Sequence, residues 1–509
     1  MRRKIGFILI WLSALVFAVP QAARAQDTRS LRGLDDYITR AITAWDVPAL
    51  SIAVVRNDSV LLVKGYGTLG KGRTERVDEN TIFGIGSLTK AFTSTATAML
   101  VGEGRLGWDD KVVDRIDGFR LYEPYTTAHV TVRDILAHRT GLARGDRMWY
   151  DRALDREAVV RRVRYSPPDW SFREHWVYSN TMYTAAGLVV GAVAGESWDD
   201  FVTERIFRPL GMRRSNTTVR AQAGDPNVVV PYTYVRGKSV EIPVWNQDNI
   251  GPAGSINSTA TDLAQWLRFQ LGDGSYGGRR LVSAAAFRET HAPQMVLPQS
   301  SGSPSLTSYA MGWNVGDFRG NRLLTHSGGG HGVASRIAML PDRHMAVAVL
   351  SNSDGAGLST AVAYRVLDLM LGGEATDWSR NMLASRDAAI ERSAAREREL
   401  ATRRVKDAPP ALPLDAYVGE YFDPYYGVAE VTLRGDRLYL RFVGEIAGPL
   451  EHWQYETFLA HWEHPRYGSN FVSFTLDDDG KVGSIRIPPE ADTSLVVEFH
   501  RRRGGGRSP

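Results

Sequence analysis

The sequence has 509 residues, of which 43% are hydrophobic, so it holds more chain than one domain usually does and is too apolar for wholesale disorder. The absence of cysteine excludes disulfides, a cysteine nucleophile and thiolate metal ligands. Residues 1–25 contain three arginines, one lysine and no acid, so without them the formal net charge falls from +4 to zero and gives no support for a nucleic-acid partner.

The first 25 residues are typical of an export signal. Residues 2–4 are basic, residues 5–19 are apolar, and the run QAARAQ offers small residues for cleavage. We therefore expect residues 1–25 to be a cleaved signal peptide, and the mature protein to be periplasmic or secreted without a membrane contact. An uncleaved anchor is the alternative, although the apolar run is short for spanning a bilayer.

Residues 26–375 are expected to form the main domain. LDDYITRAITAW has helical periodicity, two β-rich runs surround Asn57-Asp58 as in a hairpin, and an apolar stretch after Ser87 is long enough for a buried helix. A mostly helical middle follows. Four strand-like runs, MGWNVGDF, NRLLTHS, SRIAMLP and HMAVAVLSN, then precede the helical VAYRVLDLMLG. We predict one sheet with strands from both ends of this region and helices inserted between them.

The remaining chain predicts a connector and a second domain. Residues 376–410 are rich in Ala, Arg and Glu and end at two prolines, which predicts a solvated connector helix. Residues 411–501 hold short alternating runs such as GVAEVTL and VGSIRI, which predict a small antiparallel barrel. Residues 502–509 are expected to be a disordered basic tail. The pair His461 and His464 is too sparse for a metal site, and neither a metal nor a cofactor is expected.

The stretch IGSLTK contains the first chemically suggestive pair, Ser87 and Lys90. Only eight of the 61 basic residues are lysines, and lysine, unlike arginine, can lose its proton when it is desolvated. On a helix the two side chains are neighbours, and backbone N–H groups at the helix start stabilise an oxyanion. Lys90 can then accept the serine proton. The S-x-x-K pattern alone is weak, because chance produces it often.

Two further segments offer polar groups for the same reaction. VYSN presents Tyr178 as a proton relay, its pKa lowered by neighbouring cations, and Asn180 as a donor and acceptor for Lys90 and a substrate amide. THSGGGHG presents His326 as a switchable cation on a strand whose glycines let a substrate approach, with the N–H of Gly329 completing an oxyanion hole. Each segment alone is more typical of an ordinary loop or turn.

Together, S-x-x-K, Y-x-N and H-x-G occur in the order and spacing of one family. The chain resembles the serine β-lactamase and penicillin-binding superfamily, in the branch of class C β-lactamases, D-alanyl-D-alanine carboxypeptidases, D-aminopeptidases and related esterases. Supporting stretches include DILAHRTGL, GPAGSINSTATDLAQWL and YAMGWNV, and the resemblance covers roughly residues 30–370. It implies an α+β, β-lactamase/transpeptidase-like fold, in which helices flank an antiparallel sheet beside a helical region.

The resemblance also implies roles for individual residues. Ser87 is the acylated nucleophile, Lys90 its proton partner and Tyr178 the general acid/base. Substrate binding falls to Asn180, His326, Ser327, Gly328 and Gly329. His326 stands where many members carry lysine, and a partly charged histidine holds a substrate carboxylate less firmly, which argues against a dedicated β-lactamase.

We therefore expect an exported serine hydrolase that acts on D-amino-acid-containing peptides. A carboxylesterase, a class C-like β-lactamase and a non-catalytic penicillin-binding-like protein are the alternatives; G-x-S-x-G and clustered metal-binding motifs are absent. The expected ligand is a small peptide, ester or β-lactam, and no nucleic acid. The C-terminal module resembles lipocalin-like barrels of D-aminopeptidases, which implies that residues 422–427 or an aromatic cluster, Trp453, Tyr455 and Trp462, narrow the active site, or that the barrel forms a homo-oligomer. A role in stability alone is equally compatible.

Overall fold

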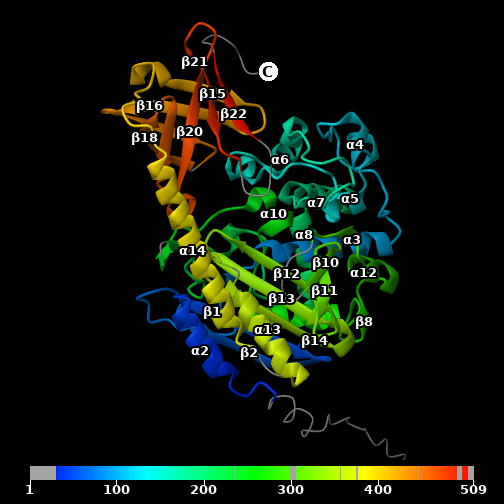
Figure 1. Cartoon of the computed structure of the whole chain (residues 1–509). Coiled ribbons are helices and arrows are strands. Elements are labelled where there is room, and N and C mark those ends of the chain that lie inside the picture. The colour runs from blue at the N-terminus through cyan, green and yellow to red at the C-terminus, as the bar shows by residue number, and fades with distance from the viewer. Residues whose placement is uncertain are drawn as a thin grey trace, which may run out of the picture.

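An eight-stranded antiparallel sheet forms the centre of the larger domain (Figure 1). The computed structural model describes residues 30–235, 237–298, 305–355, 357–373, 376–444, 446–489 and 496–502. The expected signal peptide and, except for Arg502, the expected basic tail lie outside the described residues. The strand order is β2-β1-β14-β13-β12-β11-β10-β9, so strands from both ends of the region share one sheet, as predicted, and the N-terminal hairpin pairs with the last strand of the domain.

The bounds of these eight strands are β1 (Ala49–Arg56), β2 (Ser59–Gly67), β9 (Met295–Val296), β10 (Ser305–Tyr309), β11 (Asn314–Phe318), β12 (Asn321–Gly330), β13 (Val333–Leu340) and β14 (Met345–Ser351). The hairpin between β1 and β2 turns at Asn57, whose φ is 54°. The short strands β9 and β10 extend the sheet beyond what the sequence patterns predicted.

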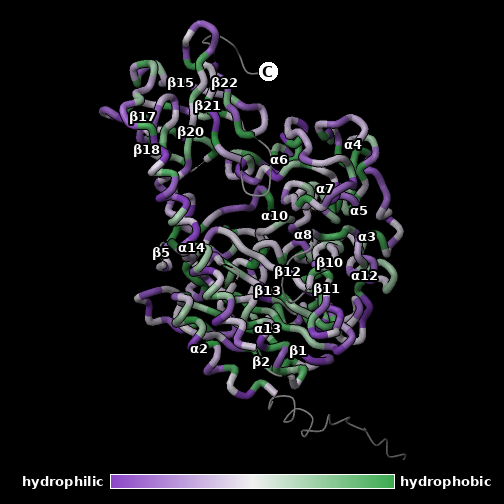
Figure 2. The backbone as a smooth tube through the Cα atoms, in the orientation of Figure 1, coloured by the Kyte–Doolittle hydropathy of each residue, from purple (hydrophilic) through white to green (hydrophobic). Residues whose placement is uncertain are grey.

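Both faces of the sheet are buried, because apolar side chains point alternately to opposite sides of each strand. In β1, Leu50, Ile52 and Val54 join one core with helices α2 (Leu34–Ala44) and α13 (Gly357–Leu371). Ala53 and Val55 join the opposite core, which contains α3 (Thr89–Gly102) and α11 (Ala260–Leu271). Figure 2 shows hydrophobic residues gathered along these elements and mainly hydrophilic residues in the peripheral loops.

A largely helical region lies between β2 and β9, as predicted. Besides α3 and α11, its α-helices are α4 (Pro124–His129), α5 (Val132–Leu136), α6 (Arg156–Arg162), α7 (Asn180–Ala194), α8 (Trp198–Val202), α9 (Arg208–Leu210), α10 (Gly251–Gly254) and α12 (Ala284–Thr290). Three short strand pairs interrupt it, and the patterns did not indicate them: β3 (Phe83–Gly84) with β6 (Asn257–Ser258), β4 (Tyr232–Val235) with β5 (Lys238–Glu241), and β7 (Ser275–Tyr276) with β8 (Arg279–Arg280).

The chain leaves this domain through a long exposed helix, α14 (Trp378–Thr402), and ends in a closed eight-stranded antiparallel barrel. The barrel strands are β15 (Gly419–Asp423), β16 (Gly427–Arg434), β17 (Arg437–Phe442), β18 (Ile446–Gln454), β19 (Thr457–His461), β20 (Ser469–Leu476), β21 (Val482–Ile487) and β22 (Val497–Arg501). The predicted α+β fold and the predicted barrel are thus both confirmed. No helix of the described ranges is both long and apolar enough to cross a membrane.

Candidate active site

The nucleophile turn packs directly against β12. Ser87 lies in the 3-10 turn Gly86–Leu88, which leads into α3. Gly86 has a φ of 51°, and a Cβ there would lie 2.8 Å from the backbone nitrogen of Gly329. A Cβ at Gly328 would lie 1.9 Å from the carbonyl oxygen of Ile85. These two glycines therefore permit the close contact that brings Ser87 beside the segment from His326 to Gly329.

Lys90 is fully buried one turn after Ser87. Its Nζ atom lies 3.1 Å from Ser87 Oγ, 2.7 Å from Asn180 Oδ1 and 2.8 Å from the carbonyl oxygen of Ala253. Burial lowers the pKa of Lys90 well below 10.5, against the attraction of the Asp146 carboxylate. A neutral amine has two hydrogens and one lone pair. It can therefore donate to Asn180 and Ala253 while accepting the proton of the serine hydroxyl.

The contact of Asn180 with Lys90 was expected from the sequence, but the carboxylate that holds Asn180 was missed. Asn180 is the first residue of α7 rather than part of a loop, and its Nδ2 donates to Asp146 Oδ1 at 2.9 Å. Asp146 is 8% exposed and also accepts from Trp149 Nε1 at 3.0 Å and from Arg144 Nε at 2.9 Å. The Asn180 side-chain amide thus accepts from Lys90 through its oxygen and donates to the buried Asp146 carboxylate through its nitrogen. No motif marks Asp146, so only the fold reveals this contact.

Tyr178 is clamped from both sides by His138. The His138 carbonyl accepts the Val177 N–H at 2.9 Å, and its Nδ1 accepts the Ser179 N–H at 3.0 Å. The ring of His138 also packs against the Tyr178 ring, with centroids 4.4 Å apart. Lys90 Nζ lies 4.6 Å from the centre of the same phenol ring. The backbone on each side of Tyr178 is therefore held, which fixes the phenol beside the nucleophile.

Burial raises the pKa of Tyr178 above its usual value, although hydrogen bonding with Ser87 and the charge of Arg144 act in the opposite direction. The expectation of a lowered pKa is therefore wrong: the Arg144 cation acts in the expected direction, but burial outweighs it. Tyr178 is a protonated phenol at neutral pH, suited to donate a proton. Lys90 is the better base of the two.

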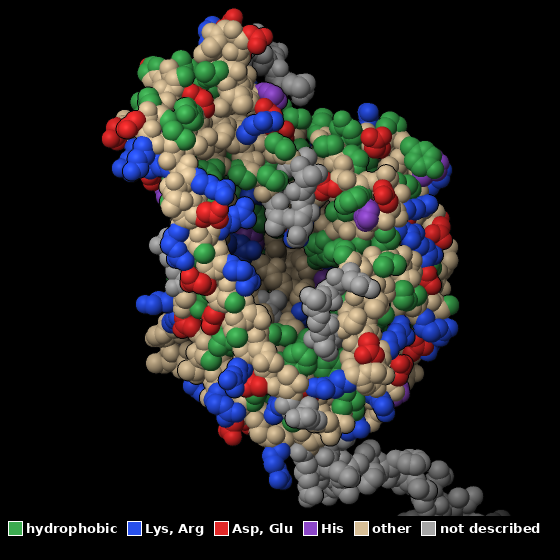
Figure 3. All heavy atoms as spheres, viewed as in Figure 1, with side chains coloured by type: hydrophobic (Ala, Val, Ile, Leu, Met, Phe, Trp, Pro, Cys, Tyr) green, Lys and Arg blue, Asp and Glu red, His purple; other side chains and the backbone are tan. Residues whose placement is uncertain are grey.

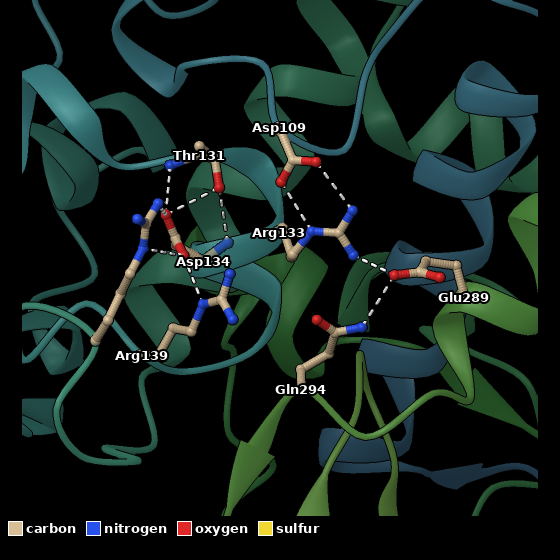
Figure 4. Close-up of polar contacts among 8 residues, drawn as sticks. Asp109, Thr131, Arg133, Asp134, Arg139, Glu289 and Gln294 are labelled. Atoms are coloured by element: carbon tan, nitrogen blue, oxygen red, sulfur yellow. Dashed lines mark hydrogen bonds and ion pairs between the residues drawn. The ribbon is translucent and has the colours of Figure 1, made fainter.

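A buried charge network holds the His138 turn in place (Figure 4). Asp134 on α5 is 0% exposed, accepts the capping bond from the Thr131 N–H at 2.9 Å and also accepts from Thr131 Oγ1 at 2.9 Å. The Arg173 guanidinium binds both carboxylate oxygens, at 3.0 and 2.7 Å, and Arg139 Nε binds Oδ1 at 2.5 Å. Since Arg173 lies five residues before Tyr178 and Arg139 directly follows His138, Asp134 ties both segments to one helix. The stretch DILAHRTGL therefore supports the site from behind, and none of its residues lines the cavity beside Ser87.

His326 is a neutral imidazole rather than the switchable cation expected from the sequence. Burial, with the nearby Lys90 charge, lowers the pKa of His326 to about 3. The Tyr309 hydroxyl, whose own pKa is raised well above 10 by burial, donates to Nε2 at 3.1 Å. The remaining ring N–H, on Nδ1, donates to the Ser327 carbonyl at 2.7 Å. Both ring nitrogens are thus engaged, and their partners fix the tautomer.

These residues meet at a cavity of about 600 Å³, lined among others by Ser87, Tyr178, His326 and Gly329. Figure 3 shows this face of the molecule hollowed below the barrel. Three aromatic side chains, Trp170, Trp176 and Tyr309, form much of the wall, and Arg144 adds a guanidinium. The structure thus brings together the predicted residues from three distant segments. Trp170, Trp176 and Arg144 lie outside the three motifs.

The backbone of β12 presents an open edge along this cavity. Residues Ser327 to Gly330 pair with β13 on one side. On the other side, the pairing of β12 with β11 ends at Thr325. Within the described residues the edge beyond Thr325 therefore has no neighbouring strand. The oxyanion role of the Ser87 and Gly329 N–H groups stays a prediction. No group of three or more His, Asp or Glu side chains with metal-binding geometry occurs in the described part of the chain.

The barrel touches the catalytic domain beside the cavity, through one of the two regions expected to do so. Tyr425, within residues 422–427, donates its hydroxyl proton to the Gly145 carbonyl at 3.0 Å. The aromatic cluster lies elsewhere. Trp453 packs against Arg404 at the end of α14, and Trp462 is buried in the barrel wall.

Family comparisons agree with this architecture. A family model described as Beta-lactamase matches residues 34–370, and one described as a domain of unknown function, DUF3471, matches residues 403–502. The unguisins hydrolase ungD of Aspergillus violaceofuscus is 30% identical over 433 residues, which cover 78% of this chain and 75% of that protein. Penicillin-binding protein 4 of Amycolatopsis lactamdurans is 29% identical over 341 residues, covering 65% and 86%.

Solved structures share the fold over nearly the whole chain. The octameric penicillin-binding protein homologue from Pyrococcus abyssi superposes with a TM-score of 0.61 at 23% identity, covering 92% of this chain and 99% of that one. The crystal structure of SurE with D-Leu gives a TM-score of 0.52 at 19% identity, covering 94% and 100%. At these identities the two similarities establish the fold.

Proposed function

This chain belongs to the beta-lactamase family of hydrolases, and we propose that it is a serine hydrolase which forms an acyl-enzyme on Ser87 and cleaves peptides containing D-amino acids. The observation that carries the proposal is the contact of 3.1 Å between Ser87 Oγ and the amine of Lys90, which is 0% exposed. A buried amine with a lowered pKa is the base that a serine hydroxyl needs.

Acylation begins with neutral Lys90. As Ser87 Oγ attacks the scissile carbonyl carbon, its proton passes to Lys90 Nζ, whose two N–H bonds remain directed at Asn180 and Ala253. The carbonyl oxygen takes up the negative charge and accepts hydrogen bonds from the N–H groups of Ser87 and Gly329. Collapse of this tetrahedral intermediate breaks the carbon–nitrogen bond and leaves an ester on Ser87.

The departing amine needs a proton, and Tyr178 supplies it. The phenol is neutral because burial raises its pKa, and Lys90, now an ammonium beside the same ring, restores the transferred proton. Lys90 is then neutral again. Water enters in place of the amine, gives a proton to Lys90 and a hydroxyl group to the acyl carbon, and the proton returns to Ser87 as the acid leaves. At the end of the cycle Ser87, Lys90 and Tyr178 have the same protons and charges as at its start, and the net reaction is the addition of one water across the cleaved bond.

A peptide is the substrate class that the cavity fits best. An extended peptide adds a strand to an open sheet edge, and the edge of β12 beyond Thr325 lies along the cavity. A relative named as a hydrolase of unguisins supports hydrolysis, and a neighbour crystallised with D-Leu supports the D configuration. His326 is neutral, so of the residues that line the cavity only Arg144 offers a cation for a carboxylate, and we rank β-lactams last.

Esterase activity is the second candidate. The walls formed by Trp170, Trp176 and Tyr309 suit apolar acyl groups, and a neutral His326 suits uncharged substrates. An ester with an acidic alcohol also leaves without the proton that an amine requires. Because of this difference, comparing the rates of ester and amide cleavage with one enzyme preparation separates the two activities.

A labelling experiment with the full chain tests the proposed function. We expect a fluorophosphonate probe to label wild type and not Ser87→Ala, with Ser94→Ala, a buried serine on α3, as the matched control that still labels. D-alanyl peptides, D-amino-acid amides, p-nitrophenyl esters and nitrocefin are then followed side by side. Absence of labelling in folded wild type contradicts the proposal, and faster ester than peptide cleavage moves the assignment to the esterase.

Two further properties are part of this proposal. Export is supported by the signal-like residues 1–25, and fractionation of a host expressing the full sequence tests it, with retention in the cytoplasm as the contrary result. Self-association through the barrel is supported by the Pyrococcus neighbour, which is an octamer. Light scattering of the purified chain measures it, and a monomer at all concentrations argues against it.

A further inference from the structure

We propose that Tyr425 of the barrel is a positioning residue for the catalytic amine, acting through Gly145, Asp146 and Asn180. The inference rests on the proposed role of Lys90 in the hydrolase reaction. It gives the C-terminal barrel a catalytic purpose beyond docking.

The contact between the two domains is close and specific. Tyr425 lies in the turn between β15 and β16, where Asp423 Oδ1 accepts the Tyr425 and Tyr426 N–H groups at 2.8 and 2.7 Å. The Tyr425 side chain is 3% exposed, and its hydroxyl donates to the Gly145 carbonyl at 3.0 Å. The acidic side chain therefore shapes the turn that presents Tyr425 to the catalytic domain.

Gly145 is a glycine because Tyr425 fills the space of a side chain. A Cβ at Gly145 would lie 2.5 Å from the Tyr425 ring. The φ of Gly145 is −132°, outside the left-handed region that favours glycine, so backbone conformation does not explain the residue. The fit between Gly145 and the tyrosine ring does.

Gly145 is linked to Lys90 through the next residue in the chain and two hydrogen bonds. Its neighbour Asp146, 8% exposed, accepts from Asn180 Nδ2 at 2.9 Å. The other end of that amide accepts from Lys90 Nζ at 2.7 Å. A shift of the backbone at Gly145 therefore moves the carboxylate that orients Asn180, and with it the amine that activates Ser87.

The rest of this segment also lies under the barrel. Arg147 Nη1 donates to the Pro488 carbonyl at 3.0 Å, at the end of β21. A Cβ at Gly444 of the barrel would lie 2.5 Å from the Tyr150 carbonyl oxygen. Barrel residues thus hold the catalytic segment at Gly145, Arg147 and Tyr150, which is the arrangement expected of a support for Asp146.

The chain of contacts has an electrostatic signature that mere docking lacks. The Asp146 carboxylate raises the pKa of Lys90, against burial and the charge of Arg144. When the Asp146 carboxylate moves away from Lys90, the pKa of Lys90 falls further. Because neutral Lys90 is the base, the rising limb of the acylation rate against pH then moves to lower pH. The other ionisable groups around the amine, Arg144, Tyr178, Tyr183, His138 and His326, all belong to the catalytic domain.

The test measures the rate of fluorophosphonate acylation of the full chain between pH 5 and 10. We expect Tyr425→Phe, which loses one hydrogen bond, to acylate several-fold more slowly, and Tyr425→Ala about tenfold more slowly with its rising limb at lower pH. Tyr421→Phe is the matched control, because it removes an equivalent buried bond, from Tyr421 OH to the Tyr417 carbonyl at 2.7 Å, inside the barrel. Its rate and pH limb should equal those of wild type.

Gly145→Ala provides an independent variant from the catalytic side. It should slow acylation alone and slow it less when Tyr425→Ala removes the opposing ring, so that the two effects are not additive. Equal rates and limbs for Tyr425→Ala and Tyr421→Phe, or additive effects in the double variant, overturn the inference. Absence of acylation in wild type instead overturns the proposed function, so the two failures are distinguishable.

Discussion

Replacement of Lys90 by methionine tests whether the buried amine is neutral in the folded protein. Methionine has a similar length and no charge, but it donates no hydrogen bond. The Asn180 and Ala253 oxygens that accept from Lys90 at 2.7 and 2.8 Å then lose a donor. Leaving two buried acceptors unsatisfied costs about 2–6 kcal/mol in the free energy of unfolding.

Removing the ionisable amine also has an opposite effect on the free energy of unfolding, and this effect depends on pH. The unfolded chain holds the Lys90 proton up to pH 10.5, whereas the folded site releases it at a much lower pH. Between these two values the unfolded state binds one more proton, so wild-type stability rises by about 1.4 kcal/mol per pH unit relative to the variant. The free-energy cost of releasing the Lys90 proton on folding, which only wild type carries, is largest at low pH and vanishes above pH 10.5. Lys90→Met is therefore expected to compare best with wild type at the lowest pH, and to lose about 3 kcal/mol of stability relative to wild type over the two units from pH 8 to 10.

Urea unfolding followed by tryptophan fluorescence at pH 7, 8, 9 and 10 measures this difference in the transition of the catalytic domain. Lys238→Met, the same substitution at an exposed lysine of β5, reports the effect of the substitution on the surface. A stability difference between wild type and Lys90→Met that is constant from pH 8 to 10 refutes the reasoning. Lys90 would then carry the same charge in both states and could not serve as the base.

Three further outcomes follow from the site. Tyr178→Phe should lower kcat/KM for D-alanyl peptides by about 10²–10⁴-fold and for p-nitrophenyl esters by much less, because nitrophenolate needs no proton; equal losses argue against proton donation. His326→Gln should leave the shape of the kcat/KM profile between pH 5 and 8 unchanged, because the wild-type imidazole, with a pKa of about 3, is already neutral there; loss of an inflection near pH 6.5 contradicts this. Asp134→Asn should destabilise the fold by about 3–5 kcal/mol in urea, since two arginines lose a buried partner, and a loss below about 1 kcal/mol speaks against the network.

Periodicity and residue order sufficed to predict the larger elements. The runs NRLLTHS, SRIAMLP and HMAVAVLSN became β12, β13 and β14, because buried strands and their turns leave a local pattern. The barrel was expected, yet β18 and β19 were not indicated individually. β18 contains Gly448 and Pro449, which normally argue against a strand. Pro449 is tolerated there because it pairs with Tyr439 of β17 and precedes the first pair with β19.

The electrostatics of the site depended on contacts that the sequence does not encode locally. Ser87, Lys90 and Tyr178 could be selected by motif. The neutral state of His326 and the raised pKa of Tyr178 arise from burial, and the supporting role of Asp146 arises from a contact 34 residues away along the chain. Such long-range burial reverses expectations based on residue type alone.

The glycine facing Tyr425 also bears on how the two domains can be inherited. In a homologue without the barrel, the Tyr425 ring atoms that lie closest to a Cβ at Gly145 would be absent. Such a homologue is therefore expected to accept a side chain at this position, whereas one that carries the barrel and the tyrosine is expected to keep glycine. Comparison of the sequences of the two groups checks this expectation.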